Sequence, residues 1–418
     1  SLFDFSDKQA EFNNHFQYAQ TLEAMGEVAY SRGKTDEAFT AFENARTRLE
    51  SLLKIQPNNL DVLMLAGANA FWLGQLNFDS SDYNAAEPWI KRYQEYSEKM
   101  YTLAPNDFNS IVELSYSYNS LGSLYLKQFN YALAKQSFTE SLKLKNQALA
   151  LKPDNKNLLR DKTDTISWIA TTEENLGNLS EALLMLEQAI NQLDSVLKIR
   201  PDDASLLNDI FNIYMQQSYL LSYFPDKKDA YLKAENATIS IKKALRQDPN
   251  NVNFKRKYYR SLSYQLMLLE DNKTSDEAIE VINYINTLTS SNPTIINIRI
   301  SLIKYFINRK NYQKAKELLN ELENDSEFKE RINNTRKIEN ESILIKTYLI
   351  KAKLEKDPIS KSEFCRKVIS TTEENSSGSK SIKTVYPLIQ AYICLNKVSE
   401  IEKNKSKLIE LGITNFDL

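Results

Sequence analysis

The stretch YNSLGSLYLKQFNYALAKQSFTESLKLKNQALALKPDN, residues 118–155, carries the pattern that decides the fold. It holds a glycine at 122, an alanine at 134 and a proline at 153. Each of these registers recurs elsewhere at steps of 48 residues: Gly26, Gly74 and Gly122, then Ala170 and Ser218; Ala38, Ala86, Ala134, Ala182, Ala230 and Ala278; Pro57, Pro105, Pro153, Pro201 and Pro249. Three registers with one period predict a repeat architecture.

Each register has a physical reason. The glycine and the alanine flank a turn, and small residues at both sites let two antiparallel helices approach closely. A larger side chain there would force the helices apart, at a cost of ~1–3 kcal/mol. The proline follows the second helix, which it cannot continue. Two Asn or Asp residues follow every proline and are expected to cap the next helix.

The apolar spacing predicts long helices. Ala134, Phe138 and Leu142 lie near one stripe of a helix, and Leu114 and Leu121 lie on the matching stripe of its partner. Each unit therefore holds two helices of about 20 residues, or ~30 Å each. Only 8 Gly and 10 Pro among 418 residues agree with long helices and few turns.

Composition excludes several classes of function. The net charge of −2 argues against a polyanion binder, and the chain has one histidine, His15, and two cysteines, Cys365 and Cys394. This leaves no parts for a zinc site, a Ser-His-Asp triad or a Cys-His dyad, and no phosphate-binding glycine motif is present. The carboxylate pairs at 173–174 and 373–374 are interpreted as polar helix ends rather than as a catalytic dyad. We expect a non-enzymatic chain without cofactor or metal.

The third unit resembles the tetratricopeptide repeat, whose 34-residue signature has an aromatic residue, Leu-Gly, Tyr, Ala, Phe and a closing Pro. The matching residues are Tyr118, Leu121, Gly122, Tyr125, Ala134, Phe138 and Pro153. The period departs from the family by fourteen extra residues between the Ala and Pro registers. The resemblance implies an all-α, right-handed α-solenoid of antiparallel helix pairs with long helices.

The repeat also divides the chain. We expect a lead-in at residues 1–18, five units of the 48-residue period at 19–250, two shorter helix pairs at 251–325, and an irregular helical region with capping helices at 326–418. The polar stretch at 371–380 is predicted to be a loop, and the last helix is expected to stop at Gly412.

The resemblance further implies that partners contact the first helix of each pair, 18, 15, 11 and 8 residues before the repeated alanine. The residues carried over by this register are Phe71, Gln75, Phe78, Tyr116, Asn119, Ser123, Asp164, Ser167, Thr171, Glu174, Asn212, Met215 and Tyr219. They include no lysine or arginine, which disfavours recognition of an acidic C-terminal tail. A mixed aromatic and polar face suits an extended peptide or a partner helix.

Charge is distributed unevenly along the chain. Residues 1–250 sum to −8 and residues 251–418 to +6. One interpretation is an ordinary solvated surface whose net charge varies along the chain. The functional alternative is an acidic partner that docks toward the C-terminal end. Residues 255–260 (KRKYYR) combine basic and aromatic side chains, as base stacking requires, but tyrosines at helical spacing favour a packed role, so a nucleic-acid partner is not expected.

Location and role stay open between alternatives. No uncharged apolar stretch is long enough to span a bilayer, and two cysteines 29 residues apart are expected to be reduced, which favours the cytoplasm. The main hypothesis is an adaptor, inhibitory or sensory subunit of a signalling or defence complex. The alternatives are a peptide- or ligand-sensing part of a larger regulator, anchored outside the cytoplasm, and an oligomeric scaffold. The sequence does not predict an oligomeric state.

Overall fold

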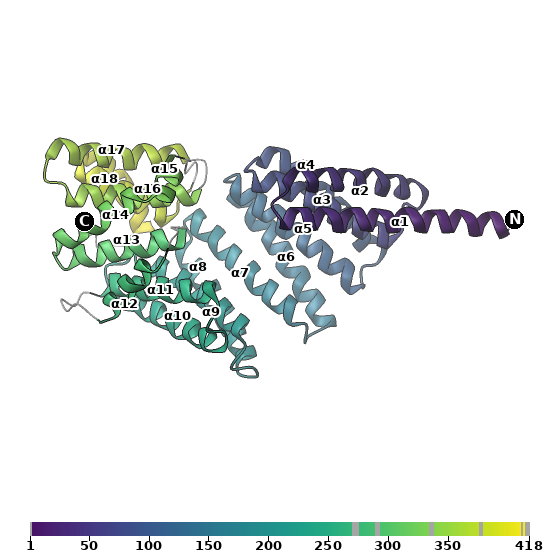
Figure 1. Ribbon diagram of the computed structural model, residues 1–418, viewed down its shortest axis with the longest axis horizontal. Helices are drawn as coiled ribbons and strands as arrows, with labels where there is room; N and C mark the ends of the chain where they lie inside the picture. The colour runs from purple at the N-terminus through teal and green to yellow at the C-terminus, as the bar shows by residue number, and fades with distance from the viewer. Residues whose placement is uncertain are drawn as a thin grey trace. The chain divides into compact units, whose positions relative to one another are not determined.

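The computed structural model describes residues 2–269, 276–288, 293–333, 338–375, 379–410 and 413. Every element in these ranges is a helix. The chain forms two compact units, unit 1 at residues 1–172 and unit 2 at residues 173–418. The helices can be followed in order in Figure 1. The prediction of an all-α solenoid of helix pairs is confirmed.

Helices alternate between the first and second member of a pair, here called A and B helices. The A helices are α1 (Leu2–Ser31), α3 (Leu60–Asp79), α5 (Phe108–Lys127), α7 (Lys156–Leu176), α9 (Ala204–Leu221), α11 (Val252–Leu268), α13 (Pro293–Asn308), α16 (Ile338–Leu354) and α18 (Ile382–Cys394). The B helices are α2 (Thr35–Ile55), α4 (Tyr83–Leu103), α6 (Tyr131–Leu151), α8 (Leu179–Leu197), α10 (Lys228–Gln247), α12 (Asp276–Asn286), α14 (Tyr312–Asn324), α17 (Pro358–Asn375) and α19 (Val398–Glu410). A short helix, α15 (Ser326–Asn333), follows α14. Only the last turn of α7, from residue 173, belongs to unit 2.

The residues after each repeated proline cap the next A helix, as predicted. In all five repeats the second Asn or Asp accepts a hydrogen bond from a backbone N–H two or three residues later. For example, Asn59 Oδ1 lies 3.1 Å from the nitrogen of Val62, and Asp107 Oδ2 lies 2.8 Å from that of Ser110. Asn155, Asp203 and Asn251 do the same for α7, α9 and α11. Each cap satisfies N–H groups that the helix itself leaves unpaired.

Close approach of the paired helices depends on the glycine register. A Cβ atom built at Gly26 would lie 2.5 Å from the ring of Phe42, and one at Gly122 would lie 2.7 Å from the ring of Phe138. The repeated alanines from Ala38 to Ala230 are fully buried. The expectation that small residues permit this packing is therefore confirmed.

The turn between A and B helices follows the same period. Gly33, Ser81, Phe129 and Gly177, at steps of 48, all have a positive φ. Glycine adopts this backbone without a steric penalty, whereas a side chain such as that of Phe129 is strained there. The repeat is thus maintained in the backbone even where the glycine is lost.

The C-terminal third keeps the pairs but shortens them. Helix α13 begins at Pro293, and α17 begins at Pro358 after α16 ends at Leu354. The predicted loop at residues 371–380 is partly wrong, because α17 continues to Asn375 and the side chain of Thr372 is buried. Gly412 and residues 376–378 lie outside the described residues.

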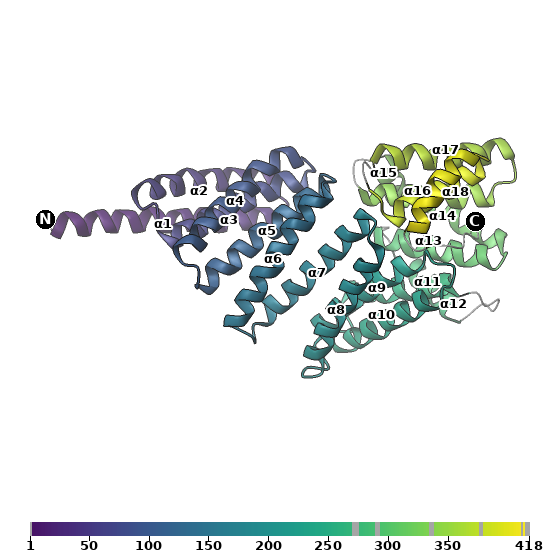
Figure 2. The ribbon, with the colours of Figure 1, turned by 180° about the vertical axis from the view of Figure 1, so that it is seen from behind.

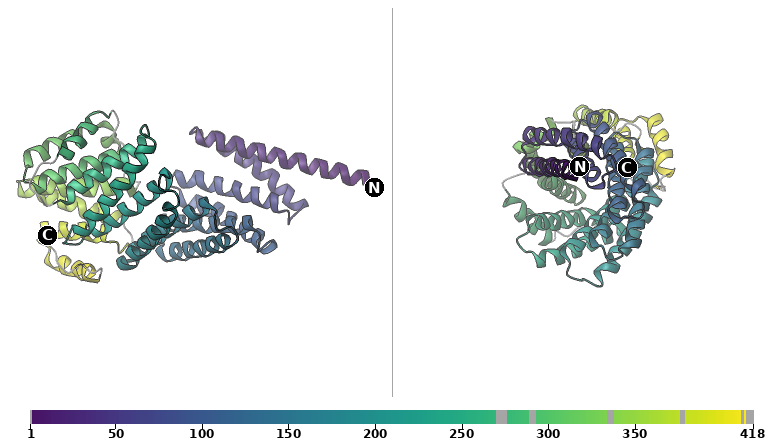
Figure 3. Two further views of the ribbon diagram at one scale, coloured as in Figure 1. Left: turned by 90° about the horizontal axis from the view of Figure 1, so that it is seen from below. Right: turned by 90° about the vertical axis from the view of Figure 1, so that its right-hand side faces the viewer.

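Within unit 2, helix α18 near the C-terminus contacts the first elements of the unit. Glu174 Oε2, in the last turn of α7, lies 3.2 Å from the ammonium of Lys383 on α18, and Glu174 also accepts a hydrogen bond from Ser381. Just after α9, Tyr223 packs edge-on against Tyr386 of α18, with ring centroids 5.3 Å apart. Helix α18 packs on α17 and α16 (Figure 2). Helix α18 therefore contacts the first elements of unit 2, and Figure 3 shows the helices from two further directions.

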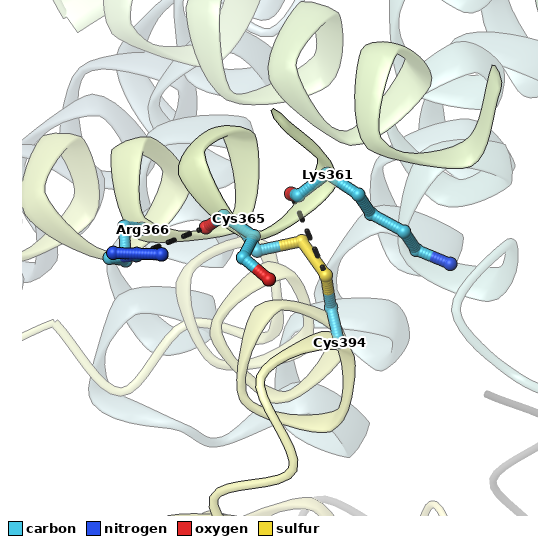
Figure 4. Close-up of a disulfide and its surroundings, with 5 residues drawn as sticks. Lys361, Cys365, Arg366 and Cys394 are labelled. Carbon is cyan, nitrogen blue, oxygen red and sulfur yellow. Dashed lines mark hydrogen bonds between the residues drawn. A yellow bond between two sulfur atoms is a disulfide. The ribbon is translucent and has the colours of Figure 1, made fainter. Parts of the chain in front are cut away.

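The two cysteines form a disulfide, which corrects the expectation of reduced thiols. Cys365 on α17 and Cys394 at the end of α18 are joined, with their Cα atoms 6.4 Å apart (Figure 4). The sulfur of Cys394 also lies 3.9 Å from the carbonyl oxygen of Lys361. Their separation in sequence gave no sign of this pairing, because it arises from how α17 and α18 pack.

Within the described ranges, no helix combines the length and apolarity that a bilayer crossing requires.

Candidate functional site

Successive A helices are joined by side-chain hydrogen bonds between residues about one repeat apart. In unit 1, Asn69 of α3 donates to Glu23 of α1 at 2.8 Å, and Trp72 donates to Glu27 at 3.2 Å. Tyr116 of α5 donates to Asp161 of α7 at 2.5 Å. In unit 2 the same relation joins α9 to α11 and α13 to α16, as described below. Such hydrogen bonds thus join α1 to α3 and α5 to α7 in unit 1, and α9 to α11 and α13 to α16 in unit 2. The side of the A helices that carries them is here called the A-helix face.

The residues predicted on α3 are partly buried and packed within unit 1. Phe71 lies between Trp72 and Tyr93, with ring centroids 5.2 Å and 5.9 Å away. Gln75 donates to Asp79 at 2.7 Å. Phe78 packs against Tyr83, at 5.3 Å between centroids.

The residues predicted on α5 are also partly buried. Asn119 accepts a hydrogen bond from Thr165 at 3.1 Å and also lies beside Ser123, whose hydroxyl donates to the Asn119 backbone carbonyl at 3.1 Å. Burial and Asp161 raise the pKa of the Tyr116 hydroxyl, which therefore stays a donor. The structure thus places these side chains in the polar connections between α5 and α7.

The four residues predicted on α7 differ in exposure. Asp164 is exposed, and Ser167 is partly buried next to Thr171, which donates to its carbonyl at 3.0 Å. Glu174 is only 2% exposed and is held in the contact with Lys383 and Ser381.

The residues predicted on α9 lie in unit 2. Asn212 is exposed, and Tyr219 is partly buried with its hydroxyl oxygen accepting a hydrogen bond from Arg260 at 2.8 Å. Met215 is 2% exposed and belongs to the core, where it packs with Phe211 and Ala234. Its register position therefore points inward and not to the surface.

Two ionisable side chains of unit 1, Lys145 and Glu23, are buried and make hydrogen bonds, although Oε1 of Glu23 has no hydrogen-bond partner among the described residues. Lys145, 1% exposed, donates to the hydroxyl of Thr165 at 2.6 Å and to the carbonyl of Asp161 at 3.3 Å. Burial lowers the pKa of Lys145 to about 8, opposed by the carboxylates of Asp161 and Asp164. Burial raises the pKa of Glu23 to about 7, opposed by the hydrogen bond from Asn69.

Unit 2 presents cations on the same face. Lys257 of α11 donates to Asn208 at 2.6 Å and to Asn212 at 3.0 Å on α9. Lys346 of α16 donates to Asn297 of α13 at 3.1 Å. Together with Arg260, Lys304 and Lys383 these residues form what we call the cation cluster: Lys257, Arg260, Lys304, Lys346 and Lys383.

The members of the cation cluster act on one another. Burial lowers the pKa of Lys346 to about 7, and the charges of Lys304, Arg260 and Lys383 lower it further. Burial also lowers the pKa of Lys304 to about 8. Burial and Arg260 lower the pKa of Lys257, opposed by Asp209. Neighbouring like charges and burial both disfavour the protonated ammonium.

The cation cluster was missed because the register was carried only through the fifth unit. Counting 18 residues back from Ala278 gives Arg260, and counting 18 and 11 back from Ala315 gives Asn297 and Lys304. The thirteen predicted residues include no cation. The same register in the next two units gives two, Arg260 and Lys304.

A hollow lies between α1 and α2 in unit 1. It has a volume of about 720 Å³ and is lined by both apolar side chains, such as Phe12 and Leu52, and polar ones. His15 lies here, with its Nδ1 3.4 Å from Arg48. Among the described residues, no group of His, Cys, Asp and Glu could hold a metal ion.

Comparisons with known proteins agree with this architecture. A family model described as tetratricopeptide repeat matches residues 115–155, and one described as plant-specific mitochondrial import receptor subunit TOM20 matches residues 172–275. A search of the curated proteins found no match.

Among solved structures, a thermophilic TPR protein of Thermus thermophilus is 18% identical, covering 58% of this chain and 98% of that chain, with a TM-score of 0.32. The human IFIT1 dimer with PPP-AAAA is 14% identical, covering 93% and 89%, with a TM-score of 0.39. The pilF protein of Pseudomonas aeruginosa is 12% identical, covering 72% and 99%, with a TM-score of 0.34. Given the repeat-model match and the paired helices, the chain is a tetratricopeptide-like repeat protein with a period extended to 48 residues.

Proposed function

We propose that this chain is a non-enzymatic interaction protein that binds a partner protein along the A-helix face, as an adaptor, inhibitory or sensory subunit. The observation that carries the proposal is the polar connection between A helices one repeat apart, from Glu23–Asn69 to Asn297–Lys346. This face offers hydrogen-bond donors, acceptors and aromatic rings over several successive helices. An extended peptide or a partner helix needs such a long, mixed surface.

Site-specific photo-crosslinking tests which face binds. A photoreactive phenylalanine analogue is placed at Gln75 or Asn212 on A helices, and at Leu184 or Ile239, which are exposed on B helices. The chain is first used to capture its partner from native lysate. Crosslinks from the A-helix positions and not from the B-helix positions are expected. Crosslinks from the B-helix positions alone would contradict the proposal.

We further propose an oxidising, extracytoplasmic location, which is the alternative to the cytoplasm. The Cys365–Cys394 disulfide supports it, since structural disulfides persist in oxidising compartments and are rare in the cytosol. Thiol labelling with a maleimide polymer after acid quenching of cells tests this. No labelling before reduction and two labels after it are expected, whereas two labels without reduction would contradict the location.

A further inference from the structure

Helix α1 exposes apolar side chains at two register positions that are buried in the A helices of the next four units. Met25 is 59% exposed, whereas Leu73, one repeat further on, is fully buried. Val28 is 47% exposed, whereas its counterpart Leu76 is 7% exposed. The counterparts on α5, α7 and α9 are buried as well: Leu121, Leu124, Ile169, Thr172, Gln217 and Leu220.

In the following repeats the preceding B helix covers these positions. Leu73 and Leu76 of α3 pack with Ala38 and Phe42 of α2, and the corresponding leucines of α5 pack in the same way with α4. The exposed side of α1 therefore continues an interface that the chain forms repeatedly. A helix that docks there removes apolar surface from water, which favours association.

The repeat's own turn does not attach a covering helix to α1. In later units a proline, such as Pro57 or Pro105, lies between a B helix and the next A helix. Gln9 occupies this register position, and α1 runs through it as one continuous helix from Leu2 to Ser31 (Figure 1). A covering helix therefore reaches α1 by another route, and a second copy of the chain offers one.

The exposed side of α1 is complementary to itself. Its positions alternate at three and four residues, the spacing along which two long helices pack. All members of this row, here called the α1 seam, are exposed: Glu11, Asn14, Tyr18, Thr21, Met25, Val28 and Arg32. Antiparallel pairing of two seams places Tyr18 of one copy beside Met25 and Val28 of the other. Glu11 then lies within about one helical turn, ~5.4 Å, of Arg32 of the other copy. Opposite charges thus meet at both ends of an apolar centre.

The last B helix is less suited to this position. The exposed middle of α19 carries Glu402, Lys403 and Lys407, so head-to-tail contact would bring charged side chains against Met25 and Val28. Pairing of α1 with α1 avoids this. It is also a two-fold contact, the commonest symmetry of soluble oligomers.

We propose that the chain forms a homodimer in which α1 packs antiparallel to α1 of a second copy along the α1 seam. Tyr18 also lines the hollow of about 720 Å³ between α1 and α2, which gives side chains of the second copy room to pack. The α1 seam lies on the side of the helix opposite Glu23 and Glu27, which bond α3. The inference therefore goes beyond the proposed function and does not depend on it.

Sedimentation velocity of the full chain tests the dimer at about 1 to 100 µM, since interfaces of this kind begin at micromolar affinity. The wild type should sediment as a dimer at the upper end. Met25→Lys with Val28→Lys should weaken the dimer about tenfold or more. The matched control adds the same charge at exposed leucines of α6, Leu133→Lys with Leu151→Lys, and should change the affinity less than about twofold. Circular dichroism checks that each variant is folded.

Charge reversal tests the ends of the α1 seam. Glu11→Arg should weaken the dimer about threefold or more, because two arginines then face each other at each end. Adding Arg32→Glu should restore the affinity to within about twofold. A second substitution that fails to restore the dimer would contradict the antiparallel pairing.

Spin labels measure the direction of the helices. In an antiparallel pair, labels at Ala24→Cys lie near the two-fold axis, and labels at Ala10→Cys are separated by roughly 35–40 Å. The native cysteines are paired and do not react with the label. Equally short distances from both sites would show parallel helices and overturn the pairing.

Two further results would overturn the dimer itself. One is a wild type that stays monomeric throughout the concentration range. The other is a dimer that the Met25 and Val28 substitutions weaken no more than the control does. In a monomeric wild type, binding of a peptide with the sequence of α2, Thr35–Ile55, that Met25→Lys with Val28→Lys abolishes would assign this side of α1 to a partner helix instead.

Discussion

The charged side chains on the A-helix faces of the two units have different neighbours. In unit 1, Lys145 sits among Thr165, Asp161 and Asp164, and the carboxylate of Glu23 is held by Asn69. In unit 2, Lys304 and Lys346 face other cations. Hydrogen-bonded polar groups stabilise the packing of one helix on the next, whereas neighbouring like charges cost stability. One repeat architecture thus places carboxylates near Lys145 in unit 1 and other cations near Lys346 in unit 2.

The largest expected effect comes from the disulfide, which only unit 2 has. Replacing both cysteines, Cys365→Ala with Cys394→Ala, opens a loop of 29 residues. By the loop-entropy argument unit 2 should lose about 3–4 kcal/mol. All three tryptophans, Trp72, Trp89 and Trp168, lie in unit 1, so tryptophan fluorescence reports unit 1 and circular dichroism reports both.

In urea titrations, the tryptophan transition should keep its midpoint while the dichroism transition moves to lower urea. The matched control is the wild type without reductant. An unchanged dichroism transition in the variant would show that the cross-link contributes nothing to unit 2.

The second prediction compares two buried lysines. Lys145→Met should destabilise unit 1 by about 1–3 kcal/mol, because Asp161 and Thr165 lose their shared donor. Lys346→Met should leave the stability of unit 2 unchanged or raise it, because it removes an uncompensated charge. Urea unfolding of both variants measures this. Equal destabilisation by the two substitutions would erase the contrast between the units.

The third prediction concerns packing within a pair. Gly122→Ala should cost unit 1 about 1–2 kcal/mol, since overpacking against Phe138 outweighs the gain in helix propensity. At the same register in unit 2, Ser218 donates to the carbonyl of Ala230 at 2.6 Å. Ser218→Ala should cost only about 1 kcal/mol, the value of that hydrogen bond. Thermal unfolding in which Gly122→Ala is stabilising would contradict the close approach.

The fourth prediction is opposite pH dependence. Glu23 has a pKa of about 7 in the folded chain, against 4.5 when it is unfolded. Between these values the folded state holds a proton that the unfolded state has released, so unit 1 loses stability as pH rises. Lys346 has a lowered pKa of about 7 against 10.5, so unit 2 gains stability as pH rises from 7 to 10.5. Each effect should be about 1–2 kcal/mol. Glu23→Gln should remove the slope in unit 1, and urea midpoints at pH 5, 7 and 9 test both signs.

The sequence predicted the fold well because one short motif governs it. Pro and the Asn or Asp after it fix where each A helix begins, and glycine against phenylalanine fixes how pairs pack. The charged contacts were harder to predict. The disulfide depends on tertiary packing, and Met215 shared a register with surface residues but lies in the core. Lys304 could have been predicted, because it lies at one of the register positions before Ala315. Lys346 could not, because its helix pair lacks the repeated alanine from which the register is counted.

The central claim is that Lys346 on the A-helix face of unit 2 lies among other cations, in contrast to Lys145 in unit 1, which has carboxylates nearby. The most direct measurement is the pKa of the Lys346 ammonium, followed by the ¹³Cε chemical shift of labelled lysine, with Lys346→Arg to assign the signal. We predict a pKa of about 7, because burial and the charges of Lys304, Arg260 and Lys383 all disfavour the protonated ammonium. An ordinary pKa near 10.5 would contradict the account.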